Sequence, residues 1–224
     1  MRNIFIVTHP EASHHTNGLV GGWYDSDLTD RGAQQADSIA KALAARLGGK
    51  TAEIFSSDLL RARHTAGVIA KSFNTGVTID PDLREKSFGE AEGKPKAWQR
   101  ERIIPLPDQG ERLRHDEGIP GAETRMDLAK RSYRAMARIL ESPETNQIVV
   151  THGGPATLLI AAWIEMPLEA AGRVQFPVSS GSITVLRKDP RNFSHQLVEL
   201  NEVSHLGLKR ATSPMRAGQE AIER

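Results

Sequence analysis

Two histidines follow short apolar runs that end in the same three residues. His9 closes "IFIVTH" and His152 closes "QIVVTH", so the chain contains Val-Thr-His twice. An apolar run of this length is typical of a buried strand. A histidine at the end of such a strand can act as a base, a metal ligand or a nucleophile. Two strands of this kind in one sheet would deliver two imidazoles to one place.

Groups that bind oxyanions surround these two strand ends. Gly153 and Gly154 follow His152 and precede a predicted helix with Pro155 in its first turn. Glycine lets backbone N–H groups approach a ligand closely, and the start of a helix favours an anion. Arg61 falls one turn into another predicted helix, where a guanidinium can hold a phosphate through two hydrogen bonds. Together these residues predict an oxyanion pocket, most simply one for phosphate.

A metal centre is the less favoured interpretation. Neither His9 nor His152 belongs to a His-x-x-x-His motif or to a carboxylate cluster, and the dense histidine pair of the chain is His14-His15. The chain contains no cysteine, which removes a thiolate nucleophile, thiolate metal ligands and a disulfide framework. We therefore expect neither a metal nor a cofactor.

The spacing of apolar residues predicts alternating strands and helices. The predicted strands are 3–7, 52–57, 77–80, 147–152, 182–188 and 195–201, the last two as a hairpin-like pair. The predicted helices are 28–47, 58–73, 122–142 and 155–164. This alternation is typical of an α/β fold, here a three-layer α/β/α sandwich with a mostly parallel sheet. Ligands of such sheets bind beyond the carboxyl ends of the strands, where His9, His152 and the loop 56–61 are expected.

Regular patterns weaken after the third strand. In the excursion at about 86–121 Gly, Pro and charged residues dominate, which predicts a functional loop or a small helical insertion. Its cations, which stand among many carboxylates, are Lys86, Lys94, Lys96, Arg100, Arg102, Arg112 and Arg114. The helix that follows has an apolar face made of Met126, Ala129, Tyr133, Met136, Ala137 and Leu140. We expect one domain over 1–206 with this excursion, and a flexible tail at 207–224.

Composition narrows the class of protein. The 224 residues are 38% hydrophobic and 25% charged, which is typical of a globular protein with a sizeable core. A net charge of +1 gives no reason to expect a nucleic acid or a membrane surface as partner. Residues 1–15 lack the long apolar run of a signal peptide, so a cytoplasmic location is expected. The expected partner is a small molecule, and a homodimer is left open.

Five segments in order resemble a known family. They are "THP" (8–10), "GWYDSDLTDRGAQQA" (22–36), "SDLLRARHTA" (57–66), "LRE" (83–85) followed by "FGEAEG" (88–93), and "VVTHGG" (149–154). The chain is thereby similar to the histidine phosphatase superfamily, with its phosphoglycerate-mutase-like fold, over roughly residues 3–206. "SHL" at 204–206 resembles the family's late strand end.

The resemblance implies a role for each matching residue. His9 would be the nucleophile that forms a phosphohistidine, with its other ring nitrogen held by a backbone acceptor. Arg61 and His152 would hold the transferring phosphoryl group, with Gly153 beside them. Glu85 would protonate the leaving oxygen and later serve as base for water. Glu123, in a segment that also resembles the family, is the alternative acid.

Departures from the family pattern matter as much. The family's Arg before the nucleophile is Thr8 here and its Gly after is Pro10, while its pocket Asn falls on His15 and a further Arg on Leu19. Losing one preorganised donor costs about 3–4 kcal/mol of transition-state stabilisation, so a weak phosphatase is expected unless another group substitutes. The candidate substitutes are His14 or His15 as an imidazolium, Arg63 and Arg84. His15 is favoured because its register matches a pocket position.

Three functions are compatible with these residues. The first is a phosphatase that hydrolyses a phosphomonoester through phospho-His9. The second is a phosphoglycerate-mutase-like phosphotransferase, which must keep water from the phosphohistidine and is less favoured because the family's arginine pair is absent. The third is a binding or regulatory protein on a weakened phosphatase fold, for which Thr8 is the main indication. The sequence does not select one phosphorylated substrate.

Overall fold

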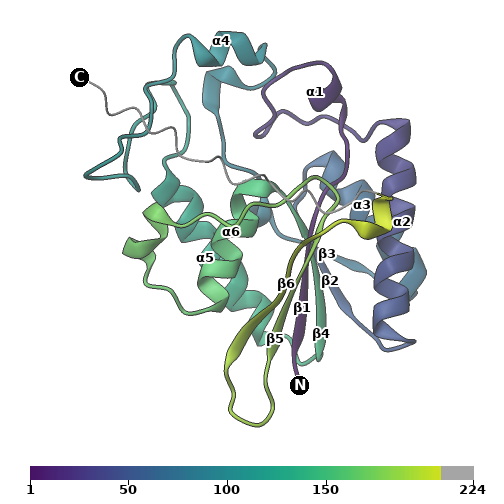
Figure 1. Cartoon of the computed structure of the whole chain (residues 1–224). Coiled ribbons are helices and arrows are strands. Elements are labelled where there is room, and N and C mark those ends of the chain that lie inside the picture. The colour runs from purple at the N-terminus through teal and green to yellow at the C-terminus, as the bar shows by residue number, and fades with distance from the viewer. Residues whose placement is uncertain (208–224) are drawn as a thin grey trace, which may run out of the picture.

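A six-stranded sheet occupies the centre of the computed structural model, which describes residues 1–207 (Figure 1). The strands are β1 (Asn3–Thr8), β2 (Glu53–Ser56), β3 (Val77–Ile79), β4 (Asn146–Thr151), β5 (Ile183–Lys188) and β6 (His195–Glu202). Their order across the sheet is β3-β2-β4-β1-β5-β6. β1 to β4 pair in parallel, whereas β5 and β6 run antiparallel at one edge. The predicted α/β class, mostly parallel sheet and terminal hairpin are confirmed.

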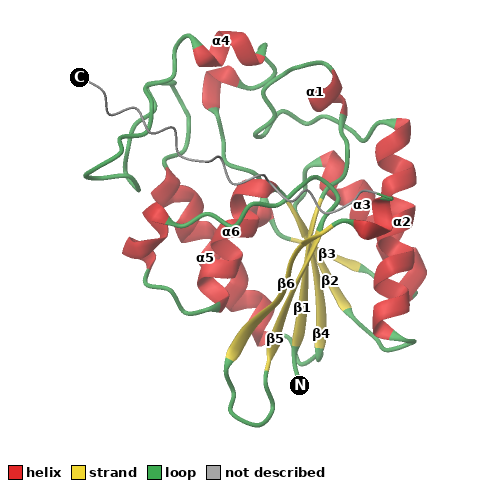
Figure 2. Cartoon of the chain, in the orientation of Figure 1, coloured by secondary structure: helices red, strands yellow, loops and turns green. Residues whose placement is uncertain are grey.

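Helices cover both faces of this sheet (Figure 2). α2 (Asp30–Leu47) and α3 (Leu60–Phe73) pack on one face, against side chains such as Phe5 and Val7. α5 (Arg125–Glu141) and α6 (Gly153–Trp163) pack on the other, against Ile4 and Ile6. Successive side chains of a strand point to opposite faces, so the continuous apolar run of β1 supplies both cores. This arrangement is the predicted three-layer sandwich.

The register of the sheet brings the two Val-Thr-His ends together. Thr8 of β1 lies opposite Thr151 of β4, and the His9 backbone N–H donates to the Thr151 carbonyl at 3.0 Å. Ser57 continues β2 in the same way, donating its N–H to Val150 at 3.0 Å. Because parallel strands end at one edge of the sheet, the residues that follow them share one site.

The long helices begin close to where the sequence predicts. Thr29 caps α2 by accepting from the Gly32 N–H, and Gly48 ends that helix in the left-handed conformation, where a side chain would be strained. α3 begins two residues later than predicted and α6 two residues earlier, with His152 as its N-cap. The start of α5 is a capping box between Thr124 and Asp127.

The buried face of α5 is wider than predicted and rotated. Met126, Ala129 and Met136 are buried as expected, but Ala137 is exposed. Its buried residues are Met126, Leu128, Ala129, Arg131, Ser132, Ala135, Met136 and Ile139. Each residue turns the helix by about 100°, so a stripe through 128, 132, 135 and 139 leaves position 137 on the solvent side. Arg131 thus enters the interior, where it contacts the site described below.

Short elements and loops build the region above the carboxyl ends of the strands (Figure 1). They include α1 (Ser13–Thr16) and α4 (Lys96–Arg100). The chain also forms the 3₁₀ turns Pro81–Leu83, Gly89–Ala91, Leu168–Arg173 and Ser204–Leu206, of which the last two lie beside the helices. The excursion shares a small core with the loop that follows α1, in which Val20, Ala91 and Ile119 are buried. It is therefore an ordered insertion that packs on residues 18–20 rather than a linker. No helix within residues 1–207 is long and apolar enough to cross a membrane. The predicted tail lies, apart from Gly207, outside the described residues.

Candidate active site

A cavity of about 270 Å³ opens beyond the carboxyl ends of β1 and β4. Five predicted site residues line it: His9, His15, Arg61, Glu85 and Gly153. The sixth, His152, lies behind the wall with its ring centroid 5.0 Å from that of His9. Within residues 1–207 no three His, Asp or Glu side chains converge as metal ligands would.

His9 has the geometry of a neutral nucleophile. Its Nδ1 lies 2.8 Å from the Pro10 carbonyl oxygen, which can only accept, so Nδ1 carries the proton. Nε2 therefore keeps its lone pair and accepts from Arg61 Nε at 3.2 Å. Burial, and next the charge of Arg61, hold the pKa of His9 well below its usual 6.5. The ring is thus uncharged near neutral pH, and Nε2 keeps a lone pair that can attack once the Arg61 N–H turns from it to a ligand.

His152 presents a buried nitrogen without a partner. Its side chain is fully buried, and Nε2 lies 2.9 Å from the Ser57 hydroxyl. Nδ1 has no hydrogen-bond partner among the described residues. Burial is the main cause that holds the pKa of His152 well below 6.5, followed by His9 and Arg61. A buried polar nitrogen without a partner is costly, and an anion in the adjacent cavity would supply the missing acceptor.

Arg61 is the buried cation of the site. It is the second residue of α3 and only 1% exposed. Besides His9, it donates through Nη1 to the Tyr24 carbonyl at 2.9 Å and through Nη2 to the Gly22 carbonyl at 2.6 Å. A guanidinium has about five N–H donors, so one donor on each terminal nitrogen remains for a ligand. The "GWYD" segment is thereby explained, since its backbone orients the arginine.

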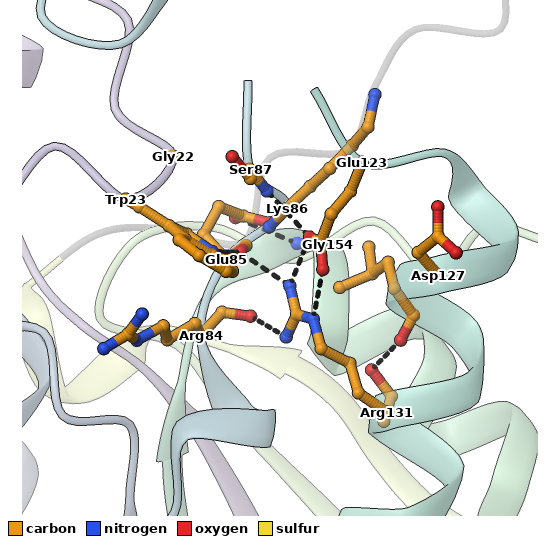
Figure 3. Close-up of polar contacts among 12 residues, drawn as sticks. Gly22, Trp23, Arg84, Glu85, Lys86, Ser87, Glu123, Asp127, Arg131 and Gly154 are labelled. Atoms are coloured by element: carbon orange, nitrogen blue, oxygen red, sulfur yellow. Dashed lines mark hydrogen bonds and ion pairs between the residues drawn. The ribbon is translucent and has the colours of Figure 1, made fainter. Parts of the chain in front are cut away.

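Glu85 lines the cavity and Glu123 does not. Figure 3 shows the polar contacts of both carboxylates. One Glu85 carboxylate oxygen accepts from the Gly154 N–H at 3.1 Å and the other from the Lys86 N–H at 2.8 Å. Both oxygens of Glu123 bond to Arg131 instead. Of the two predicted acids, only Glu85 has its carboxyl at the cavity.

The histidine pair of α1 faces the cavity rather than solvent. The rings of His14 and His15 lie 4.0 Å apart, and the His15 ring stacks on His9 at 5.5 Å with a 14° tilt. Burial, then His15, Arg61 and Lys96, lower the pKa of His14 to about 3. Burial, then Lys96 and Arg61, also lower the pKa of His15. These shifts count against the expectation that either histidine serves as an imidazolium near neutral pH, because cations and desolvation both oppose a second charge.

His15 offers the pocket a neutral donor. Its Nδ1 accepts the Ala12 backbone N–H at 3.2 Å, so the neutral ring carries its proton on Nε2. That nitrogen bonds to no other described residue. His15 thus lines the cavity with an available N–H, at the position where the family carries an amide.

Thr8 lines the cavity wall, whereas the two arginines predicted as substitutes lie elsewhere. The Thr8 hydroxyl donates to the Ser179 carbonyl at 2.5 Å and accepts the Ser182 N–H at 3.1 Å, so it tethers a loop of the cavity wall. Arg84 forms a bidentate ion pair with Asp58 and stacks on Trp23 at 4.7 Å. Arg63 is exposed and, like Arg84, does not line the cavity.

Lys96 is a cavity residue that the sequence did not single out. It lies at the start of α4, lines the cavity, and forms no ion pair with a carboxylate among the described residues. Its charge helps to lower the pKa of both His14 and His15, which shows how close it lies. No spacing distinguishes it from the other cations of the excursion. Its position comes from a tertiary contact: the Lys96 backbone N–H donates to the Gly18 carbonyl at 3.0 Å and places α4 beside the end of α1.

Comparisons with known proteins identify the family to which the chain belongs. The model of the histidine phosphatase superfamily (branch 1) matches residues 4–202. A probable phosphoglycerate mutase of Escherichia fergusonii is 31% identical over 215 residues, which are 92% of this chain and 95% of that protein. A mycobacterial glucosyl-3-phosphoglycerate phosphatase solved with VO3 superposes with a TM-score of 0.74 at 25% identity, covering 91% of this chain and 100% of that one. A putative alpha-ribazole-5'-P phosphatase from Escherichia coli gives 0.69 at 27%, covering 90% and 96%.

Proposed function

We propose, from the premise that this chain belongs to the histidine phosphatase superfamily, that it hydrolyses a phosphomonoester through a phosphohistidine on His9. The observation that carries the proposal is the tautomer of His9. A backbone carbonyl holds the proton on Nδ1, and Nε2 faces the cavity side by side with the Arg61 guanidinium. This pair places a lone pair and a buried positive charge where one phosphoryl group can meet both.

In the first step the lone pair of His9 Nε2 attacks phosphorus. The N–P bond forms while the bond from phosphorus to the ester oxygen breaks, and the Glu85 carboxyl gives its proton to that oxygen. Negative charge on the equatorial oxygens is met by the two remaining N–H groups of Arg61, by Nδ1 of His152 and by the Gly153 N–H at the start of α6. The dephosphorylated alcohol then leaves.

In the second step water replaces the imidazole. The Glu85 carboxylate accepts a proton from water as its oxygen bonds to phosphorus, and the N–P bond breaks with its electrons returning to Nε2. Inorganic phosphate leaves, and Glu85 and His9 regain their starting protonation states. The same carboxyl thus serves as acid and then as base, as microscopic reversal of the first step requires.

Two residues take over part of the work of the absent arginines. His15 supplies a neutral N–H donor, and Lys96 supplies a positive charge at the cavity wall. A neutral donor is weaker than a guanidinium because charge-assisted hydrogen bonds are roughly twice as strong. We therefore expect a working phosphatase for a small phosphorylated substrate, with weaker phosphate binding than two arginines would give.

A phosphoglycerate-mutase-like phosphotransferase is the second candidate, because a relative at 31% identity is called a probable phosphoglycerate mutase. A mutase must return the phosphoryl group to a second hydroxyl before water reaches it. The solved neighbours named as phosphatases, and a cavity with a single buried guanidinium, favour hydrolysis. A binding protein without turnover is the third, and it has no need of His9 and Glu85 in reacting positions.

Three measurements distinguish these functions. Purified protein is incubated with p-nitrophenyl phosphate and with 3-phosphoglycerate, and the products are followed by ³¹P NMR. Hydrolysis releases inorganic phosphate, a mutase yields 2-phosphoglycerate, and a binding protein yields neither. Rapid acid-free quenching with a ³²P-labelled substrate should then trap an alkali-stable phosphoprotein, as expected of a phosphoramidate. His9→Ala should abolish turnover and label, whereas His115→Ala, outside the cavity, should retain both. Turnover by His9→Ala would end the proposal.

A further inference from the structure

The side chain of Arg131 enters the interior from α5 and ends beside the segment that carries Glu85 (Figure 3). It is only 6% exposed. Nε and Nη2 each donate to one Glu123 carboxylate oxygen at 2.8 Å. The remaining donors reach backbone carbonyls: Asp82 at 2.9 Å, Arg84 at 2.5 Å and Glu85 at 2.7 Å. All of its roughly five N–H groups are thus in use.

The segment 82–85 depends on such side-chain donors for its position. It lies outside the strands of the sheet, so its carbonyls have no partners in a ladder. Arg131 satisfies three of the four, and the Thr151 hydroxyl donates to the remaining one, at Leu83, at 2.7 Å. The Glu85 carbonyl also accepts from Trp23 Nε1 at 2.7 Å. The backbone of the general acid is therefore held from α5, from the end of β4 and from the "GWYD" loop.

The guanidinium contacts the backbone of Glu85 and not its carboxyl group. A general acid must carry a proton, and a guanidinium paired directly with its carboxyl would favour the ionised form. The charge of Arg131 is met instead by Glu123, in a bidentate pair of which both side chains are largely buried. Glu123 also accepts the Ser87 N–H at 2.8 Å, so the pair holds the chain on both sides of Glu85.

We propose that Arg131, neutralised by Glu123, is a positioning residue for the acid step, and that it holds the Glu85 carboxyl against the leaving oxygen. This inference rests on the proposed function, since it concerns the residue that protonates the leaving group. It also gives Glu123 a role: the second acid that the sequence suggested is the counter-ion of the residue that positions the first.

The test compares two substrates that differ in their need for a proton. Phenyl phosphate has a poor leaving group that needs the acid, whereas 2,4-dinitrophenyl phosphate leaves as a stable phenolate. Arg131→Lys keeps the charge but cannot bridge the carboxylate and three carbonyls. We expect kcat/KM, which reports the phosphorylation of His9, to fall about 10- to 100-fold on phenyl phosphate, a fraction of what an acid contributes, and to change less than about 3-fold on the dinitrophenyl ester. The second step, in which Glu85 acts as base, is common to both esters, so kcat does not separate them. Arg134→Lys is the matched control, because Arg134 is an exposed arginine of the same helix that reaches the Asp82 side chain, and it should match wild type on both esters.

A second pair of variants separates positioning from folding and from the acid itself. Glu85→Gln should show the same selective loss, and Arg131→Lys in that background should add little, because both act on one group. If Arg131→Lys does not fold, Glu123→Gln, of equal volume, should show the selective loss instead. Equal losses of kcat/KM on both esters in a folded variant, or no loss, would overturn the inference. Absence of turnover in wild type, or a Glu85→Gln variant that loses kcat/KM equally on both esters, would instead contradict the proposed function.

Discussion

Acidification should destabilise the folded protein through His14, whose ring is buried in its neutral form. The side chain is 6% exposed, with Nδ1 at 2.6 Å from the Ser26 hydroxyl. Nε2 lies so close to Gly21 that a Cβ added there would be 2.8 Å from it. Burial, then His15, Arg61 and Lys96, lower the pKa of His14 to about 3 from the ordinary 6.5. A proton on this ring would have to enter an already positive, poorly solvated site.

The sign and size of the effect follow from linkage. Below pH 6.5 the unfolded chain protonates His14, while the folded protein does so only near pH 3, so the unfolded state binds more protons in between. The free energy of unfolding must therefore decrease as the pH is lowered through this window, by up to about 1.4 kcal/mol per pH unit for one group. At pH 5, about 1.5 units below the unfolded pKa, the loss is about 2 kcal/mol. His9 and His152, whose pKa values are also lowered, add to it in the same direction.

Urea unfolding at pH 7.5 and pH 5 measures this loss. His14→Gln removes the titrating ring but keeps a polar group beside Ser26. Wild type should lose about 2 kcal/mol more than His14→Gln between the two pH values. His64→Gln, at an exposed position of α3, is the control and should keep the wild-type difference. If His14→Gln loses as much stability as wild type, His14 is not neutral in the fold and the description of the imidazole cluster is incorrect.

Three further predictions concern the cavity. Gly154→Ala should lower kcat/KM about 100-fold with an unchanged Tm, because its Cβ would lie 2.2 Å from a Glu85 carboxylate oxygen, whereas Gly67→Ala, with open space on α3, should leave activity intact. His15→Asn should retain most activity by restoring an amide donor, while His15→Phe should lose about 10-fold in kcat/KM. Lys96→Met should raise KM about 10-fold with little change in kcat, and the effect should shrink at high salt; a change in kcat alone would contradict a binding role.

The part of the site that follows strand ends could be predicted from the sequence. A continuous apolar run identifies a buried strand, and parallel strands end at one edge, so His9 and His152 had to lie near each other once both runs were strands of one sheet. The pairing of Thr8 with Thr151 shows directly that the two strand ends lie side by side. Arg61 follows for the same reason, since it lies in the first turn after β2. These residues are positioned by periodic elements, and periodicity is visible in a sequence.

The part built by loops could not be predicted in this way. Whether His14 and His15 face solvent or the cavity depends on Ser26, 12 residues along the chain, and on α4, which begins at Lys96. Neither contact leaves a periodic signal near position 14. Lys96 differs from its neighbouring cations only in where the excursion folds. The protonation state of the histidine pair cannot be predicted from the sequence for the same reason: burial and nearby cations, which lower both pKa values, are properties of the assembled fold.

Thr8 stands where the family has an arginine, and this difference changes the kind of hydrogen-bond donor in the pocket rather than removing all donors. Its hydroxyl anchors the Ser179 loop, which forms part of the cavity wall, while His15 lines the cavity as a neutral ring and His152 lies behind it with an unpartnered Nδ1. The positive charge of the cavity wall is then carried by Arg61 and Lys96 among the described residues. Neutral donors bind a dianion less tightly than guanidinium groups do, but they also trap the phosphate product less tightly. A pocket of this composition suits turnover by water, because the product of hydrolysis must leave, better than a mutase cycle, which depends on keeping a phosphorylated intermediate bound.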